Sequence, residues 1–146
     1  MFNFTERLAS IMYGWTMDAT ESSFDQVFDS ANAGYGMEYC LFFLLGVSLL
    51  STLTFYFGIS SNIRNSTPKN YLLTMIIGYL VLVGANYLGI ASIYGNEAIE
   101  SFNLVKICLM DIFYFVVLYE IFSLVFKGFS NASWIDLISI LFNKKI

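Results

Sequence analysis

Three ionisable side chains fall inside one strongly apolar stretch, KICLMDIFYFVVLYEIF, at residues 106–122. They are Lys106, Asp111 and Glu120, and residue types of this kind can carry protons, pair with cations or line an aqueous path. A charge near the centre of a bilayer costs at least about 2.5–3.5 kcal/mol on insertion scales. Because nothing comparable occurs in the other apolar stretches, this stretch is the first candidate for function.

Helical geometry separates the two acids. At ~100° per residue, Lys106, Glu120 and Lys127 lie on one stripe of a helix, and Asp111 points to roughly the opposite side. We therefore expect one carboxylate to face helices of the same subunit and the other a subunit seam or a lumen. In a functional interpretation the helix lines a polar pathway. In a structural one the acids accept hydrogen bonds from hydroxyls and from the Asn86 amide, and fix helix register; both remain open.

Catalysis is a poor match for this set of residues. The chain contains no histidine, the commonest acid/base catalyst and metal ligand. Asp111 and Glu120, on opposite faces, could meet only across two subunits. Cys40 and Cys108 lie in apolar stretches and cannot form a zinc site without further ligands. We expect no enzyme, no metal site and no cofactor.

The elements that must position these residues are membrane-spanning helices. Of the 146 residues, 58% are apolar and 12% charged, against about 25% charged in soluble domains. Three predominantly apolar stretches are longer than the ~20 residues that a helix needs to cross a bilayer: residues 39–59, 71–94 and 102–126. In hydrocarbon the backbone must satisfy its own hydrogen bonds, so the three stretches are helices. The predicted fold is an all-α membrane protein with a three-helix transmembrane domain at 39–126.

The second span carries small residues at regular intervals. Thr74, Gly78, Ala85 and Gly89 form two small-xxx-small pairs, a pattern that lets helix backbones approach closely. The pattern predicts close helix packing and favours a homo-oligomer.

Both ends of the chain have a helical apolar face. In the acidic segment 1–38 this face includes Phe4, Leu8 and Trp15, and in the tail 127–146 it includes Trp134. We predict amphipathic interfacial helices at both ends. In the tail, Ser133 together with Asp136 has the spacing of a helix-start signature.

The charge distribution predicts an orientation. The first connector carries Arg64 and Lys69, and the end of the tail carries Lys144 and Lys145. Since positive loops remain in the cytoplasm, we expect the N-terminus outside and the C-terminus inside. The chain start has neither the basic region nor the apolar core of a signal peptide, and a bacterial inner membrane is the expected location. Without a basic stripe, nucleic acid is not an expected partner.

Two functions match these observations. The first is a homo-oligomeric channel or pore-type assembly, with a bacterial membrane effector as one setting, in which the acids of the third span act as lumen groups. The second is a membrane anchor or scaffold subunit of a larger envelope complex, in which the amphipathic ends dock partners. The expected partners are the lipid bilayer, further copies of the chain and a partner membrane protein.

Overall fold

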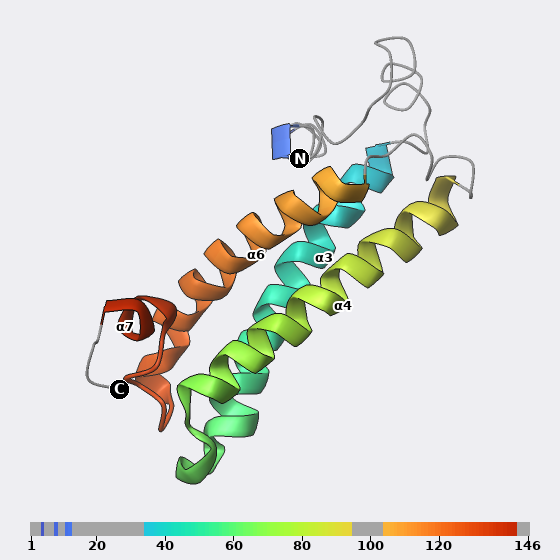
Figure 1. Cartoon of the computed structure of the whole chain (residues 1–146). Helices are drawn as coiled ribbons and strands as arrows, with labels where there is room; N and C mark the ends of the chain where they lie inside the picture. Colours follow the sequence, from blue (N-terminus) through green and yellow to red (C-terminus); the bar gives the residue numbers. More distant parts are fainter. Residues whose placement is uncertain (1–3, 5–7, 9–10, 13–33, 95–103, 143–146) are drawn as a thin grey trace. The chain divides into compact units, whose positions relative to one another are not determined.

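The structure is a computed structural model that describes residues 34–94 and 104–142, together with Phe4, Leu8, Ile11 and Met12 in the N-terminal segment. The regular elements of these ranges are all helical (Figure 1). In the ranges 34–94 and 104–142, the α-helices are α3 (Gly34–Leu53), α4 (Pro68–Tyr94), α6 (Leu104–Phe126) and α7 (Leu137–Phe142).

Three of these helices are long and apolar enough to cross a membrane. Their apolar windows are Cys40–Ser61, Pro68–Gly89 and Cys108–Phe129, each of 22 residues. At a rise of about 1.5 Å per residue, such a length covers the ~30 Å hydrocarbon core of a bilayer. The prediction of an all-α chain with three membrane-spanning helices is confirmed, and these helices are compatible with a small membrane protein. The amphipathic interfacial helices at the two ends remain a prediction.

The first span changes its helical type before it ends. After Leu53 the chain continues as a π-helical turn over Thr54–Gly58 and a short 3₁₀ turn over Ile59–Ser61. The N–H of Ile59 bonds back to the carbonyls of both Phe55 and Thr54. Phe55 and Tyr56, which are adjacent in this turn, are both buried. The Tyr56 hydroxyl can therefore form a hydrogen bond inside the protein.

The described chain divides into two compact units. One comprises Met1–Leu44 with Leu82–Phe113, and the other comprises Leu45–Val81 with Tyr114–Ile146. The second unit has an aromatic core, in which the rings of Phe55 and Tyr71 lie 5.1 Å apart, edge to face, as do those of Tyr71 and Tyr119 at the same distance. Edge-to-face pairs of this kind stabilise a core by about 0.5–1.5 kcal/mol beyond the burial of area.

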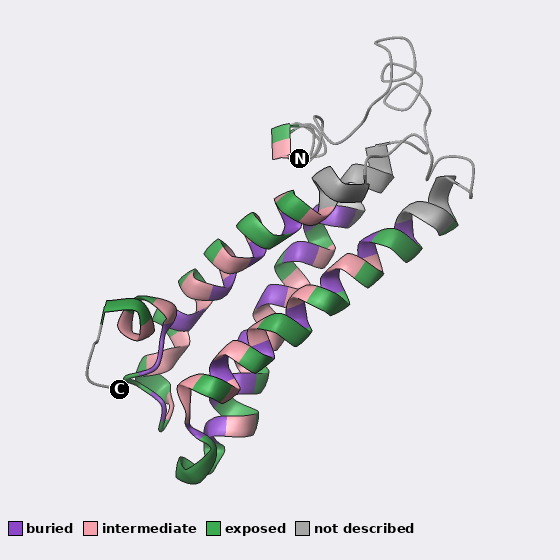
Figure 2. Cartoon of the chain, viewed as in Figure 1, coloured by how far each residue is buried: buried purple, intermediate pink, exposed green. Residues whose placement is uncertain are grey.

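The second unit is also closely packed at a glycine of α4. A Cβ atom placed on Gly78 would lie 2.7 Å from Cζ of Phe115 and 3.0 Å from Cβ of Ser51. No real side chain tolerates such distances, so glycine is required for α4 to approach its neighbours here. Gly78 itself is buried, and exposed residues alternate with buried ones along the helices (Figure 2). Many of the exposed residues are large and apolar.

Candidate functional site

The first compact unit contains a fully buried polar pair, Asn86 on α4 and Asp111 on α6, here termed the buried pair. Neither side chain has any solvent exposure. Nδ2 of Asn86 donates to Oδ2 of Asp111 over 2.8 Å. The other amide atom, Oδ1 of Asn86, has no hydrogen-bond partner within the part of the chain that the structure describes. An orphaned acceptor in a membrane interior is costly, so it marks a place where water or another chain would be stabilising.

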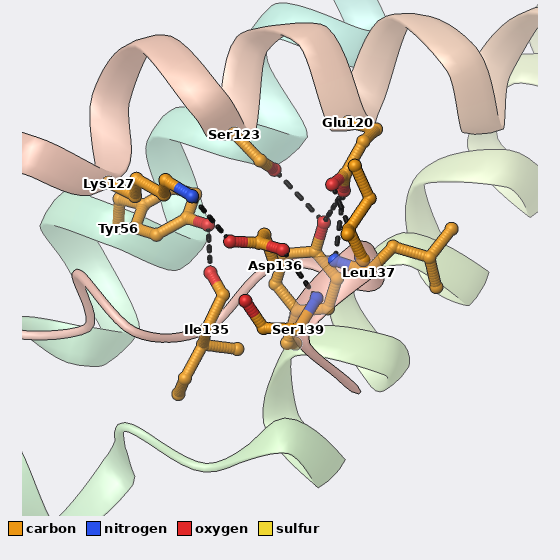
Figure 3. Close-up of polar contacts among 10 residues, drawn as sticks. Tyr56, Glu120, Ser123, Lys127, Ile135, Asp136, Leu137 and Ser139 are labelled. Atoms are coloured by element: carbon orange, nitrogen blue, oxygen red, sulfur yellow. Dashed lines mark hydrogen bonds and ion pairs between the residues drawn. The ribbon is translucent and has the colours of Figure 1, made fainter. Parts of the chain in front are cut away.

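The second unit contains a different arrangement around Glu120 of α6. This carboxylate is half-buried and accepts three hydrogen bonds. Oε2 accepts from the Tyr71 hydroxyl at 3.0 Å and from the backbone N–H of Leu137 at 2.9 Å, and Oε1 accepts from the N–H of Ile138 at 3.3 Å (Figure 3). Leu137 and Ile138 form the start of α7, where backbone N–H groups have no partner in the helix itself. Glu120 therefore satisfies them from a neighbouring helix, and its negative charge also favours that helix end.

An ion pair lies beside this contact. Nζ of Lys127 is 2.6 Å from Oδ2 of Asp136, whose side chain is 2% exposed. Oδ1 of the same carboxylate accepts from the N–H of Ser139, also at 2.6 Å (Figure 3). Burial raises the pKa of Asp136, but the hydrogen bonds from Lys127 and Ser139 outweigh it, so the pKa lies below its ordinary value of 3.8. Asp136 is thus the N-cap of α7.

Three further contacts hold the chain between α6 and α7. The Tyr56 hydroxyl donates to the carbonyl of Ile135 over 2.5 Å, and the side chain of Ile135 is fully buried. The hydroxyls of Ser60 and Ser130 lie 2.9 Å apart, and Ser130 also donates to the carbonyl of Tyr56. We term residues 127–142 the C-terminal segment. The C-terminal clamp is the set of four side chains whose contacts fix this segment, two from the spans and two from the segment itself: Tyr56, Glu120, Lys127 and Asp136.

Asp111 and Glu120 both have partners in the same chain, whereas one of them was predicted to face a subunit seam or a lumen. Asp111 is directed to Asn86 and Glu120 to the C-terminal segment. Lys106 lies on α6, and its side chain is outside the described part of the structure.

The residues predicted for close helix packing lie along α4. Thr74, Gly78 and Gly89 are buried and Ala85 is half-buried. The Thr74 hydroxyl bonds to the carbonyl of Asn70, one turn earlier, as is usual for a hydroxyl residue in a membrane helix.

The predicted interface anchors are only partly described. Phe4 is exposed and Leu8 is half-buried, while Trp15 lies outside the described residues. Trp134 is 49% exposed. The prediction placed the start of the tail helix at Ser133, with Asp136 three residues inside it. The structure begins α7 at Leu137, because Asp136 reaches the free N–H of Ser139 while Lys127 holds its other oxygen.

The sequence interpretation did not identify the hydroxyl partner of Glu120. The Tyr71 hydroxyl donates to this carboxylate, and Oγ of Ser123 lies 3.0 Å from the same hydroxyl. No spacing along the sequence pairs Tyr71 with Glu120, because the two residues belong to different helices.

The oxygens of Glu120 and Asp136 all meet hydrogen-bond or ion-pair donors of the same chain. No group of three or more metal-ligating side chains occurs in the described ranges 34–94 and 104–142. Comparison with protein-family models, with curated proteins and with solved structures found no match.

Proposed function

We propose that the chain is a membrane anchor or scaffold subunit of a larger envelope complex. The observation that carries the proposal is that Asp111 and Glu120 both have their hydrogen-bond partners within the chain. A pore-lining acid has to face water, whereas these carboxylates fasten helix to helix and helix to the C-terminal segment. The three spans are therefore used to hold a fixed structure in the membrane.

The exposed faces of the spans support the same proposal. The exposed large side chains of α6 in its described part are apolar: Leu109, Ile112, Phe113, Val117, Ile121, Leu124 and Val125. Thr54, an exposed polar residue within the first span, turns its hydroxyl to the Leu50 carbonyl of its own helix at 2.7 Å. Such surfaces are suited to lipid tails or to an apolar partner helix.

The proposed setting is a bacterial inner membrane, with the N-terminus outside and the C-terminal segment on the cytoplasmic side. Arg64 and Lys69, both exposed in or beside the first connector, support this orientation. In this role the C-terminal clamp fixes the C-terminal segment to the first and third spans. The proposal assigns no reaction to the chain.

Reconstitution of the purified chain tests this function. We expect a monomer by light scattering, no ion flux above that of empty liposomes, and a stoichiometric complex when the chain is co-expressed with the products of neighbouring genes. A stable oligomer that conducts ions, with a Glu120→Gln variant that changes the conductance, would overturn the proposal. The Asn70→Gln variant, which changes a polar side chain near the start of α4, is the control for the flux measurement.

A second candidate is a homo-oligomeric channel or pore, including a bacterial membrane effector. It is favoured by two buried polar atoms, Oδ1 of Asn86 and the hydroxyl of Tyr119, that have no partner within the described residues. In a bilayer each of them requires water or a group from another chain. An image of purified particles with rotational symmetry, together with ion flux, would support this candidate over the first.

A further inference from the structure

Several large apolar side chains outside the three spans have no cover. In the C-terminal segment, Ile138, Leu141 and Phe142 are 51%, 68% and 80% exposed. Their spacing of three and one residues places them on one face of α7. Trp134, just before this helix, is also exposed, as is Ile63 in the first connector. Exposed apolar side chains gathered on one element mark an interaction surface.

Hydrogen bonds fasten these two regions to each other. Nδ2 of Asn131 donates to the carbonyl of Ser61 at 3.2 Å, and the hydroxyls of Ser60 and Ser130 are paired. The connector that carries Ile63 is thus attached to the turn that precedes α7. We define the basic apolar patch as seven exposed apolar and basic residues of the connector, the first turn of α4 and the C-terminal segment. They are Ile63, Arg64, Lys69, Trp134, Ile138, Leu141 and Phe142.

The patch is positive because it contains Arg64 and Lys69 and no acid. Asp136 is paired with Lys127, and Glu120 is engaged by the N–H groups at the start of α7. Arg64 and Lys69 are exposed and make no ion pair within the described residues. Free cations beside apolar side chains are the combination that binds the headgroup region of an anionic leaflet.

We propose that the basic apolar patch docks on anionic phospholipids of the cytoplasmic leaflet. The apolar side chains of α7 enter the boundary between headgroups and acyl chains, and Arg64 and Lys69 contact lipid phosphates. A second copy is the poorer occupant, because two patches that each carry Arg64 and Lys69 and no acid would repel each other. The inference rests on the membrane setting and orientation of the proposed function, and not on any protein partner.

Trp134 provides the probe for a test on the full chain. The sequence holds two tryptophans, so a Trp15→Phe variant leaves Trp134 alone. This variant is reconstituted with phosphatidylcholine and phosphatidylglycerol, of which one at a time is brominated near the headgroup end of its acyl chains. Quenching of Trp134 reports contact with lipid, and the ratio of the two quenching curves gives the relative association constant for the anionic lipid.

We expect strong quenching and a preference for phosphatidylglycerol that decreases in high salt. Arg64→Gln and Lys69→Gln should each lower the relative association constant by about fivefold, while the matched control Arg64→Lys retains it. Equal quenching by the two lipids would overturn the role of the cations. Absence of quenching, or cross-linking between chains through Ile138→Cys, would overturn lipid as the occupant. Because the purified chain is used alone, these results do not depend on whether a protein partner exists.

Discussion

Asp111 and Glu120 belong to the same helix, α6, but the chain uses them in opposite ways. Asp111 is fully buried and accepts a hydrogen bond from the Asn86 amide. Glu120 is half-buried and meets a phenol and two backbone N–H groups. The buried pair joins α4 and α6, whose own backbone hydrogen bonds do not depend on it. The carboxylate of Glu120 supplies hydrogen bonds that α7 cannot make for itself.

This difference explains why a span with so few charges retains two acids. A short helix such as α7, with six residues, gains little from propagation and cannot form alone in water. Its first N–H groups must be satisfied, and charge-assisted hydrogen bonds are about twice as strong as neutral ones. Glu120 therefore stabilises α7 and the C-terminal segment that contains it, whereas Asp111 helps to determine which faces of α4 and α6 are in contact. Both are structural uses of an intramembrane charge.

The largest expected effect comes from breaking the buried pair on one side. In Asn86→Leu the fully buried carboxylate of Asp111 loses its amide donor, and we expect the free energy of unfolding to fall by about 2 kcal/mol. That exceeds the ~0.6 kcal/mol average for side-chain hydrogen bonds in membrane proteins, because the acceptor is an acid. Unfolding by denaturing detergent, followed by circular dichroism, measures the change.

Two controls sharpen this prediction. Tyr87→Leu changes an exposed neighbour on α4 and should have little effect. The double variant Asn86→Leu with Asp111→Leu removes both polar groups and should recover most of the lost stability. If Asn86→Leu behaves like Tyr87→Leu, the amide does not stabilise Asp111.

Loss of the Glu120 carboxylate should have a smaller and more local effect. In Glu120→Leu the N–H groups of Leu137 and Ile138 lose their acceptor, and we expect about 1–2 kcal/mol of local destabilisation, by analogy with loss of an N-cap. Hydrogen exchange at these two amides should accelerate roughly 5- to 30-fold. Glu120→Gln keeps an oxygen acceptor without the charge and should give an intermediate acceleration.

The three spans should keep their exchange protection in both variants, since their backbone hydrogen bonds lie within the helices. Loss of protection throughout α4 and α6 would show that Glu120 stabilises the whole bundle, and the contrast with the buried pair would then fail. Unchanged exchange at Leu137 in Glu120→Leu would show that the carboxylate does not order α7.

The spans were predictable from sequence, and the C-terminal clamp was not. Apolar length depends only on composition along the chain, and the windows of the structure overlap the predicted stretches 39–59, 71–94 and 102–126. The clamp depends on how residues 127–136 fold back toward α6, and neither hydropathy nor helical periodicity carries that information. For the same reason the partner of Glu120 could not be chosen in advance.

Local signals also competed at the start of α7. Ser133 and Asp136 both have side chains that can cap a helix, and the sequence pattern favours the first of them. The ion pair with Lys127 favours Asp136 as the capping residue. Similarly, the π-helical turn of the first span leaves no mark in an apolar run, although it brings Tyr56 within reach of Ile135.

The smallest expected effect is the pH dependence of the clamp. Because the pKa of Asp136 in the folded chain lies below 3.8, its carboxylate contributes stability that is present above the unfolded-state pKa and is lost as pH falls through the folded-state value. We expect the amide NMR signal of Ser139 to be constant down to about pH 4–5 and to titrate below about 3.8, with a loss of about 0.5–1 kcal/mol for this partly exposed pair. Lys127→Gln should move the midpoint upward, and Asp136→Asn should abolish the titration at Ser139. A midpoint for Ser139 above 3.8 would mean that burial of Asp136 outweighs its ion pair with Lys127 and its hydrogen bond from Ser139, so that the clamp would not stabilise the charged form of this acid.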